Sequence, residues 1–444
     1  MHRFFFVVMI SLICTSVRAE PQVSLPSASE FSGVTPEMRT PGFWIARHPD
    51  PDKLVMNPVR INGVNEHLVR QGLIIDLTAF PAAYDGKKLK EEISGAFGAL
   101  KKRTLSLADG NVAGADFYDT LEARMHLEDI PSAVEPRFGF IATTADERLI
   151  PTEETLYAQA GDVDFDEVQN SGLDSATPVV ILHQTGDGKW FFVKDAIASG
   201  WVRADKVAVV LREEFLSYVE RRDIVVVIAA RADIYLDLRM TKYYGSVKMG
   251  ARFVIKNRVG KAVEVLLPQE SASGFLSPGD VNIGFLPFTP RVIYDQAFKM
   301  LDKPYGWGDM NAGQDCSRFI QMVFATVGLQ LPRNSSEQRQ VGTLLDGFRE
   351  DLSPENREAY LVGDGVGALT LLGLKGHIML YLGEVDEKPY AIHATWSYKE
   401  KAPDGQGEVA RFIKRVAVTG LDLGAGSAKG ALLERIISIR VIEK

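Results

Sequence analysis

The stretch Gln314-Asp315-Cys316-Ser317-Arg318-Phe319 (residues 314–319) begins the segment that decides the fold of this chain. After Cys316, apolar residues recur at the spacing of a helix, at Phe319, Ile320, Val323, Phe324 and Val327. Gly328 and Pro332 are expected to end that helix. Cys316 would then lie in its first turn, with Asp315 as the N-cap. At that position unpaired backbone N–H groups and the helix dipole favour a thiolate.

Two histidines downstream supply a base and a group that orients it. Residues 378–382 and 389–393 read as adjacent strands, joined by a turn that contains Gly383 and charged residues. His377 precedes the first strand and His393 ends the second, so the two rings would lie side by side. Taken alone, a cysteine on an amphipathic helix is usually a core residue. Together with two histidines in this order, Cys316 predicts a cysteine hydrolase triad.

The sequence around these residues resembles that of a known protein family. The stretches LDKPYGWGDMNAGQDCSRFIQMVFATVGLQLPRNSSEQ (301–338) and GHIMLYLGEVDEKPYAIHATW (376–396) resemble the NlpC-type cell-wall cysteine peptidases, a papain-like family. The resemblance implies a papain-like α+β catalytic domain, which we place at residues 276–444. In it Cys316 would attack an amide carbonyl, His377 would hold the thiolate as an imidazolium and then protonate the leaving amine, and His393 would orient His377.

The same resemblance assigns substrate contacts. The backbone N–H of Cys316 is an oxyanion donor, to which Tyr305 can add. Asp315 is expected to recognise a free amine of the substrate, and Ser317 and Ser335 its carboxylate. Arg333 would add charge there, although an arginine in a loop is more often solvated.

The substrate that this pocket implies is a peptidoglycan stem peptide with a free N-terminal L-Ala. The bond cleaved would join γ-D-glutamate to an L-diamino acid. Arg318 replaces a small residue of simpler relatives, and residues 386–388 place three charges in the loop between the histidines. These departures leave the fine specificity open.

The beginning of the chain predicts export. Residues 1–19 combine a short charged region, an apolar run and a small residue at a cleavage site, as a signal peptide does. Cys14 follows the bulky Ile13, which argues against lipidation. No later apolar run reaches the roughly 18 residues of a membrane span. We therefore expect a mature protein without stable membrane insertion, in the periplasm or in the extracellular or cell-wall space.

Composition excludes several other functions. Without residues 1–19 the only cysteine is Cys316, so no disulfide can form within the mature chain. The seven histidines lack metal-site spacing, and we expect neither a metal nor another cofactor. Loss of Arg3 and Arg18 changes the formal charge from -8 to -10 (-8 - 2), and no basic cluster compensates it. Nucleic acid is therefore not an expected partner.

Three further units are expected before the catalytic domain. Residues 20–128 read as a mostly helical N-terminal domain or clip, whose best helix candidate spans 87–103. Short β runs with turn signals then predict one SH3-like barrel at 129–212 and a second at 213–275. The words VVILHQTGDGKWFFV (179–193) and GWVRADKVAVV (200–210) resemble bacterial SH3 domains that precede NlpC-type domains. The fold class is thus multi-domain α+β.

Within the first barrel, the acidic stretch Asp164–Glu167 ordinarily reads as a solvated loop. The resemblance places such loops at the wall of the peptidase cleft. We therefore expect Asp164, Asp166 and Glu167 to join Asp315 in holding a substrate ammonium. His183 reads as a polar residue at a strand end.

Two alternative functions stay open. A papain-fold amidase or acyltransferase on cell-wall material would use the same triad for different chemistry. A non-catalytic protein would use the barrels to bind the wall and carry an inert papain-like domain. The presence of Cys316, His377 and His393 together argues against the second alternative.

Overall fold

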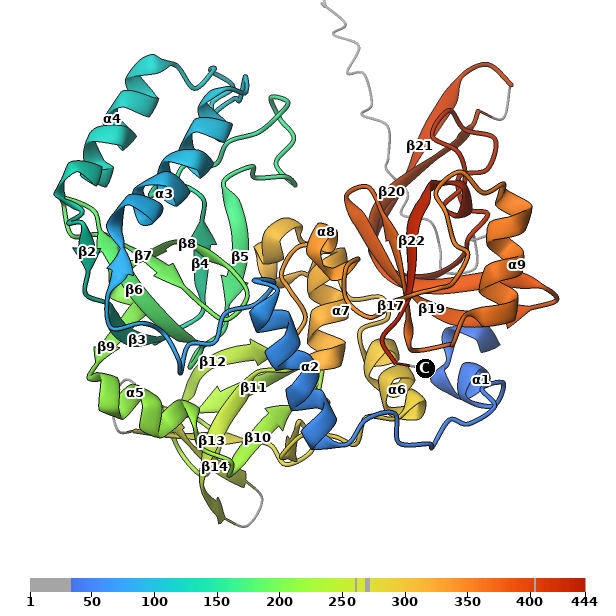
Figure 1. Cartoon of the computed structure of the whole chain (residues 1–444), viewed down its shortest axis with the longest axis horizontal. Helices are drawn as coiled ribbons and strands as arrows, with labels where there is room; N and C mark the ends of the chain where they lie inside the picture. Colours follow the sequence, from blue (N-terminus) through green and yellow to red (C-terminus); the bar gives the residue numbers. More distant parts are fainter. Residues whose placement is uncertain (1–32, 260–261, 268–271, 403–404, 444) are drawn as a thin grey trace, which may run out of the picture.

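Three sheets of six or seven strands, with helices around them, make up most of the described chain. This computed structural model describes residues 33–259, 262–267, 272–402 and 405–443. The expected signal peptide and Cys14 lie outside these residues. In Figure 1 two sheets lie on one side and the third on the other, with α6 (Pro290–Lys299), α7 (Cys316–Ala325) and α8 (Ser335–Gln338) between them.

The first sheet contains a hairpin of β6 and β7 whose turn includes Gly186-Asp187-Gly188. Its strands are β3 (Arg137–Ile141), β4 (Ala145–Arg148), β5 (Gln169–Leu173), β6 (Pro178–Gln184), β7 (Trp190–Lys194), β8 (Ser199–Arg203) and β9 (Val207–Val210). They pair antiparallel in the order β5-β4-β8-β7-β6-β3-β9. At the hairpin, the Thr185 hydroxyl and the Lys189 N–H donate to the Asp187 carboxylate at 2.7 and 3.1 Å. The predicted strands of this region are confirmed.

A second sheet follows after helix α5 (Arg212–Val219), whose Phe215 packs into the core of the first sheet. Its strands are β10 (Ile224–Val227), β11 (Arg231–Tyr235), β12 (Tyr243–Lys248), β13 (Arg252–Val259), β14 (Ala262–Leu267), β15 (Ala272–Leu276) and β16 (Val281–Ile283). The order is β12-β11-β15-β14-β13-β10-β16. Because β16 pairs with β10, this sheet continues past residue 275, where the second barrel was expected to end.

The N-terminal helices are divided between two cores. They are α1 (Pro41–Ile45), α2 (Pro58–Arg70), α3 (Gly86–Lys101) and α4 (Ala115–Met125). The buried side chains of α1 and α2 belong to the core around α7, whereas those of α3 and α4 pack with the aromatic residues of the first sheet. Strands β1 (Tyr84–Asp85) and β2 (Ala133–Val134) pair in a two-stranded antiparallel sheet, which brings the residues before α3 beside those that follow α4. Residues 33–128 contain α1 to α4, but the buried residues of these helices share the cores of other units, and a separate N-terminal helical domain stays a prediction.

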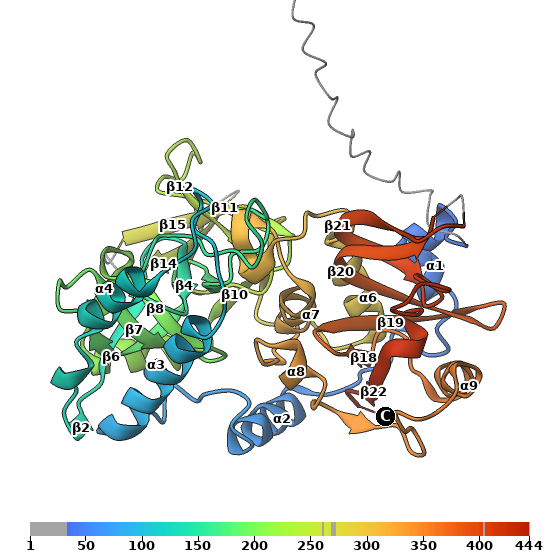
Figure 2. The same cartoon turned by 90° about the horizontal axis from the view of Figure 1, so that it is seen from above.

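The third sheet carries the histidines. Its strands are β17 (Thr343–Leu344), β18 (Thr370–Leu374), β19 (His377–Val385), β20 (Lys388–Lys401), β21 (Glu408–Gly420) and β22 (Ile436–Val441), and α9 (Pro354–Asp364) lies beside them. The order is β17-β22-β18-β19-β20-β21. Helix α7 packs against β19, β20 and α6 (Figure 2). The apolar pattern after Cys316 is the buried face of this helix, so the helix prediction is confirmed.

Within residues 33–259, 262–267, 272–402 and 405–443, no helix combines the length and the apolar character needed to cross a membrane.

Candidate active site

Cys316 is the first residue of α7, as the sequence predicted. Asp315 caps the helix, because its Oδ1 accepts the Arg318 N–H at 2.9 Å. The cysteine is 6% exposed, and its sulfur lies beside the backbone N–H groups of Ser317 and Ile378. Ile378 is the residue after His377, so the helix start meets the start of β19. This placement puts the sulfur next to the strand that carries the first histidine.

The two histidines form a hydrogen-bonded chain that ends at a threonine. His377 Nε2 lies 2.7 Å from His393 Nδ1, and His393 Nε2 lies 3.0 Å from Thr419 Oγ1. If His393 donates to Thr419, its Nδ1 accepts from His377 Nε2–H, which leaves His377 Nδ1 as the proton acceptor. Antiparallel pairing of β19 with β20, and of β20 with β21, builds this chain. The predicted pairing of the two histidine strands is therefore confirmed.

Burial keeps the side chains of Cys316, His377 and His393 uncharged in the protein without substrate. Desolvation, followed by the nearby Asp315 carboxylate, raises the pKa of Cys316 to about 12. Desolvation, followed by Arg435, lowers the pKa of His377 to about 4, and burial lowers the pKa of His393 well below its usual range. The helix N-terminus was expected to favour a thiolate beside an imidazolium. Burial outweighs that effect here, so Cys316 is a thiol and His377 a neutral imidazole.

This protonation state predicts the pH dependence of alkylation. We expect the rate of Cys316 modification by iodoacetamide to rise steadily from pH 6 to pH 9, because only the thiolate reacts and its pKa is raised. Quenched samples with mass measurement of the labelled peptide give the rate. A plateau from about pH 5 to pH 8 would instead show a preformed thiolate–imidazolium pair. Free glutathione in the same buffers provides the reference for an unperturbed thiol.

The hydrogen-bonded chain from His377 through His393 to Thr419 predicts that substitutions along it reduce activity by decreasing amounts. We expect His377→Ala to remove nearly all turnover, because His377 accepts and returns the proton. His393→Asn should cost less, since it retains a hydrogen-bonding group, and Thr419→Val should cost least. Comparing kcat with KM separates these effects, since an orienting group should alter kcat and leave KM nearly unchanged. A Thr419→Val loss as large as that of His377→Ala would contradict this order.

Tyr305 belongs to an aromatic cluster at the edge of the site. Its ring lies 5.6 Å from that of Trp396 and 6.4 Å from that of Phe165, which comes from the first-sheet unit. Phe165 also contacts Trp307 and Trp396, at 5.4 and 4.9 Å between ring centroids. Burial and then the nearby Cys316 raise the pKa of Tyr305, so its hydroxyl stays protonated close to the sulfur. It can therefore donate to an oxyanion formed at Cys316.

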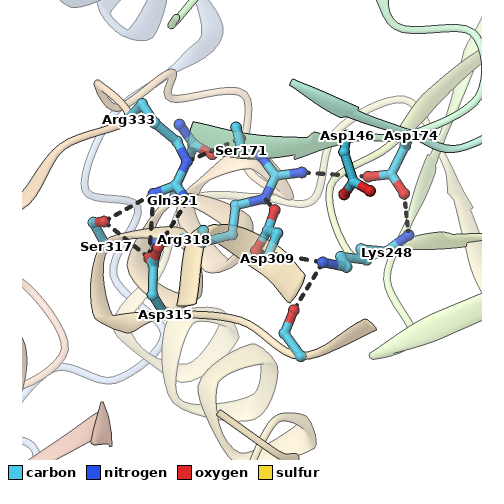
Figure 3. A network of polar contacts seen from close by, with 12 residues as sticks. Asp146, Ser171, Asp174, Lys248, Asp309, Asp315, Ser317, Arg318, Gln321 and Arg333 are labelled. Atoms are coloured by element: carbon cyan, nitrogen blue, oxygen red, sulfur yellow. Dashed lines mark hydrogen bonds and ion pairs between the residues drawn. The ribbon is translucent and has the colours of Figure 1, made fainter. Parts of the chain in front are cut away.

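Asp315 is already paired with a buried cation. Arg333, 3% exposed, donates from Nη2 to Asp315 Oδ2 at 2.7 Å and from Nη1 to Oδ1 at 3.2 Å. The Ser317 hydroxyl donates to Oδ1 at 3.0 Å (Figure 3). Asp315 is therefore ion-paired within the protein, and its contact with a free substrate amine stays a prediction. Ser335 begins the short α8 and is only partly buried.

The carboxylates of the acidic loop are also paired with cations of the protein. Asp164 pairs with Lys414 at 3.2 Å, Asp166 with Arg148 at 2.6 Å and Glu167 with Arg103 at 2.8 Å. The loop reaches the catalytic unit through Asp164 and Phe165, so it does lie against that unit. Its three carboxylates are nevertheless matched by protein cations and do not form a bare acidic wall.

A wider polar network joins the first two sheets to α7 (Figure 3). Arg318, in the first turn of α7, pairs with Asp309 at 2.9 Å and with Asp174 at 3.3 Å. Lys248 of β12 pairs with Asp309 at 3.3 Å and donates to the Gly313 carbonyl at 2.8 Å. Arg318, the departure from simpler relatives, thus ties the catalytic helix to the first-sheet unit.

Thr419, Ser171 and the pairing role of Arg333 were missed in the sequence. Thr419 lies on a strand 26 residues after His393, and Ser171, which receives the Arg333 Nε–H at 2.9 Å, lies 162 residues before Arg333. The signal that could have pointed to Arg333 is its position directly after Pro332, near the helix that carries Cys316. His183, expected as a strand-end residue, bonds the Met125 carbonyl through Nε2 at 2.7 Å.

Among the described residues, one group has the spacing of metal ligands. His126, Glu128 and Asp129 present ligand atoms within 4.8 Å of one another just after α4. The two acidic residues are exposed, and the His126 Nδ1 contacts both carboxylates at 3.4–3.5 Å. These contacts account for the group as a surface ion-pair cluster.

Comparison with known proteins identifies two parts of the chain. Residues 302–400 match the NlpC/P60 family, and residues 156–203 match the SH3 domain of the SH3b1 type. No curated protein sequence matches the chain. The chain is therefore a multi-domain protein that combines a bacterial SH3 domain with an NlpC/P60 domain, and the predicted resemblance is confirmed.

Solved structures extend this comparison to the overall fold. An NlpC/P60 endopeptidase from Photobacterium damselae subsp. piscicida superposes with a TM-score of 0.72 at 19% identity, covering 89% of this chain and 95% of that one. An NlpC/P60 family protein from Bacillus cereus gives a TM-score of 0.49 at 16% identity, covering 69% of this chain and all of the other. The first similarity shows that the arrangement of units is shared. The match of residues 302–400 to the NlpC/P60 family supports a cell-wall peptidase.

Proposed function

We propose that this protein is a cysteine endopeptidase that hydrolyses the γ-D-glutamyl–L-diamino acid bond of peptidoglycan stem peptides. The observation that carries the proposal is the position of Cys316 at the start of α7, beside the strand whose His377 is hydrogen-bonded to His393 and through it to Thr419. The base and the orienting group share a hydrogen bond, and the nucleophile lies beside the backbone N–H of Ile378, the residue after the base.

The geometry supports a proton-balanced acyl transfer. As the Cys316 sulfur bonds to the carbonyl carbon, its proton passes to His377. The resulting oxyanion is stabilised by the Cys316 backbone N–H and the Tyr305 hydroxyl. His377 then protonates the departing amine as the C–N bond breaks, which leaves a thioester. Water, activated by His377, hydrolyses that thioester and restores the thiol.

The test is mass spectrometry of defined stem peptides after incubation with the protein. Release of a fragment that begins with the diamino acid supports the proposed bond. Release of ammonia or sugar, or transfer of the acyl group to an added amine, would instead support the amidase or acyltransferase alternative. Binding to sacculi without any released fragment would support the non-catalytic alternative.

We also propose that the protein acts outside the cytoplasm. The pattern of residues 1–19 and the single remaining cysteine support export. N-terminal sequencing of the protein recovered from its native compartment tests this, with Glu20 as the expected first residue. A chain that begins at Met1, or one that carries a lipid on Cys14, would contradict it.

A further inference from the structure

We propose that the groove between α2 and the β17–β22 edge of the third sheet is a second binding site for peptidoglycan, which takes carboxylates of stem peptides on the leaving-group side of Cys316. This inference rests on the proposed function, because it concerns the polymer from which the same enzyme releases a fragment. Stem peptides suit such a site chemically. A γ-linked D-glutamate keeps its α-carboxylate free, and a peptide that is not cross-linked ends in a further carboxylate.

The first support is the lining of the groove. It has a volume of about 1020 Å³, with α2 on one side and residues 340–343 and β22 on the other. No aspartate or glutamate of the described chain lines it, although acidic residues outnumber Lys and Arg by 58 to 50 in the sequence. Hydrogen-bond donors that face no carboxylate of the protein suit an anionic ligand. The charged and amide side chains of the lining are Asn57, Arg60, His67, Gln71, Gln340 and Arg440.

The second support is the unmatched charge of Arg440. Its Nη1 donates to the Gly342 carbonyl at 2.7 Å, whereas its Nε is buried and has no partner among the described residues. Burial lowers the pKa of this guanidinium, because desolvation disfavours the charged form. A ligand carboxylate would offset that cost. The other arginine of the lining, Arg60, is already paired with Glu443.

A further arginine continues this surface toward the catalytic cysteine. Arg339 follows α8, and its Nε donates to the Ser336 carbonyl at 3.3 Å. A β-carbon at Gly373 would collide with the Arg339 Cβ and with the Ser438 hydroxyl, so both lie over β18. That hydroxyl is buried and has no partner in the described chain. Ser438 and Arg440 are two residues apart on β22, which places them on one face of the sheet.

The strand order puts these cations on the leaving-group side of the active site. In the order β17-β22-β18-β19-β20-β21, His377 is on β19, and Trp396, whose ring lies beside that of Tyr305, is on β20. Arg339 and Arg440 lie at β18 and β22, on the opposite side of β19. Because the substrate oxyanion is expected at Tyr305, the amine that His377 protonates departs toward β18 and β22.

Arg435 places another positive charge on this path, close to the base. Ile436 pairs with Leu374, and Leu374 pairs with His377. Arg435 therefore precedes the residue of β22 that lies in line with the base. After burial, its charge is the next cause of the lowered pKa of His377, so the guanidinium lies near that ring. A carboxylate on the leaving fragment would thus meet positive charge from His377 to the groove.

The experiment measures how Cys316→Ala, the full chain without its nucleophile, binds insoluble sacculi whose carboxylates are free or amidated with methylamine. We expect amidation to raise the dissociation constant about tenfold, because charge-assisted hydrogen bonds to the carboxylates are lost. Adding Arg339→Gln and Arg440→Gln should raise the constant for native sacculi about tenfold and leave that for amidated sacculi unchanged. Arg70→Gln is the matched control, since Arg70 is an exposed cation of α2 outside the groove lining, and it should change neither constant.

The outcomes separate this inference from the proposed function, because binding by Cys316→Ala does not depend on cleavage. If the unmodified protein releases no fragment that begins with the diamino acid, the proposed function fails, and the binding comparison still reports on the groove. Equal binding of native and amidated sacculi overturns the inference. A loss in the arginine double variant that is the same for both kinds of sacculi also overturns it. Should that variant not fold, Arg339→Gln alone decides by the same comparison.

Discussion

Cys316→Ala is expected to abolish cleavage of stem peptides while leaving the protein folded. The substitution removes the only atom that can form the thioester, and loss of a nucleophile typically costs at least about 10³-fold in rate. The folded state should change little, because Cys316 packs as a small buried residue and Ala keeps most of its volume. Product release followed by mass spectrometry measures the activity, and circular dichroism with a thermal melt measures the fold.

The control for this experiment is binding to sacculi. Cys316→Ala should bind insoluble peptidoglycan as well as the unmodified protein, because the SH3 domain at residues 156–203 is untouched. Cleavage by the variant within about tenfold of the unmodified rate would overturn the assignment of the nucleophile. Equal binding with no cleavage by either protein would favour the wall-binding alternative.

The catalytic chain could be predicted from local patterns because short-range geometry builds it. Helical periodicity after Cys316 placed the sulfur at a helix start, and two strand-like runs placed His377 and His393 on neighbouring strands. The hydrogen-bond partner of His393 could not be found in this way. Thr419 comes from a third strand, and its pairing with β20 leaves no mark within either segment.

The charge state of the site could not be predicted, because its ion pairs join distant parts of the chain. Asp164 and Lys414 are 250 residues apart, and Arg103 and Glu167 are 64 residues apart. A sequence shows how many carboxylates a loop contains, but only the fold shows which of them meet cations. The acidic loop therefore read as a free ammonium site when its charges are in fact matched.

For the N-terminal helices, the positions could be predicted from local patterns, but the packing partners could not. The candidate at 87–103 corresponds closely to α3 (Gly86–Lys101), because apolar spacing and the Asp85 cap are local features. Helix α2 begins after Asn57 and Pro58, a helix-start signal, and the Asn57 side chain accepts the Arg60 N–H at 2.9 Å. Which core each helix would join depends on contacts that no local pattern records.

The second large effect is expected in the stability of single and double variants of the Asp315–Arg333 pair. Asp315→Asn leaves the buried guanidinium without its counter-ion, and an arginine cannot release its proton, so we expect a loss of about 3–5 kcal/mol. Arg333→Gln should cost less, because a buried carboxylate can take up a proton and become neutral. The double variant should recover much of the loss. Urea midpoints followed by tryptophan fluorescence compare the four proteins, and additive single losses would contradict the coupling.

The loss of stability in Arg333→Gln is expected to depend on pH. In the unmodified protein Arg333 offsets the effect of burial and holds the pKa of Asp315 below its usual value. The pair therefore contributes stability at neutral pH, which is lost as pH falls through that lowered pKa. Without Arg333, burial should raise the pKa of Asp315 above its unfolded value, so the penalty of the buried charge is present at pH 8 and relieved as pH falls toward 5. The deficit of Arg333→Gln should therefore shrink over that range, while that of Asp315→Asn stays constant, since its guanidinium is charged throughout.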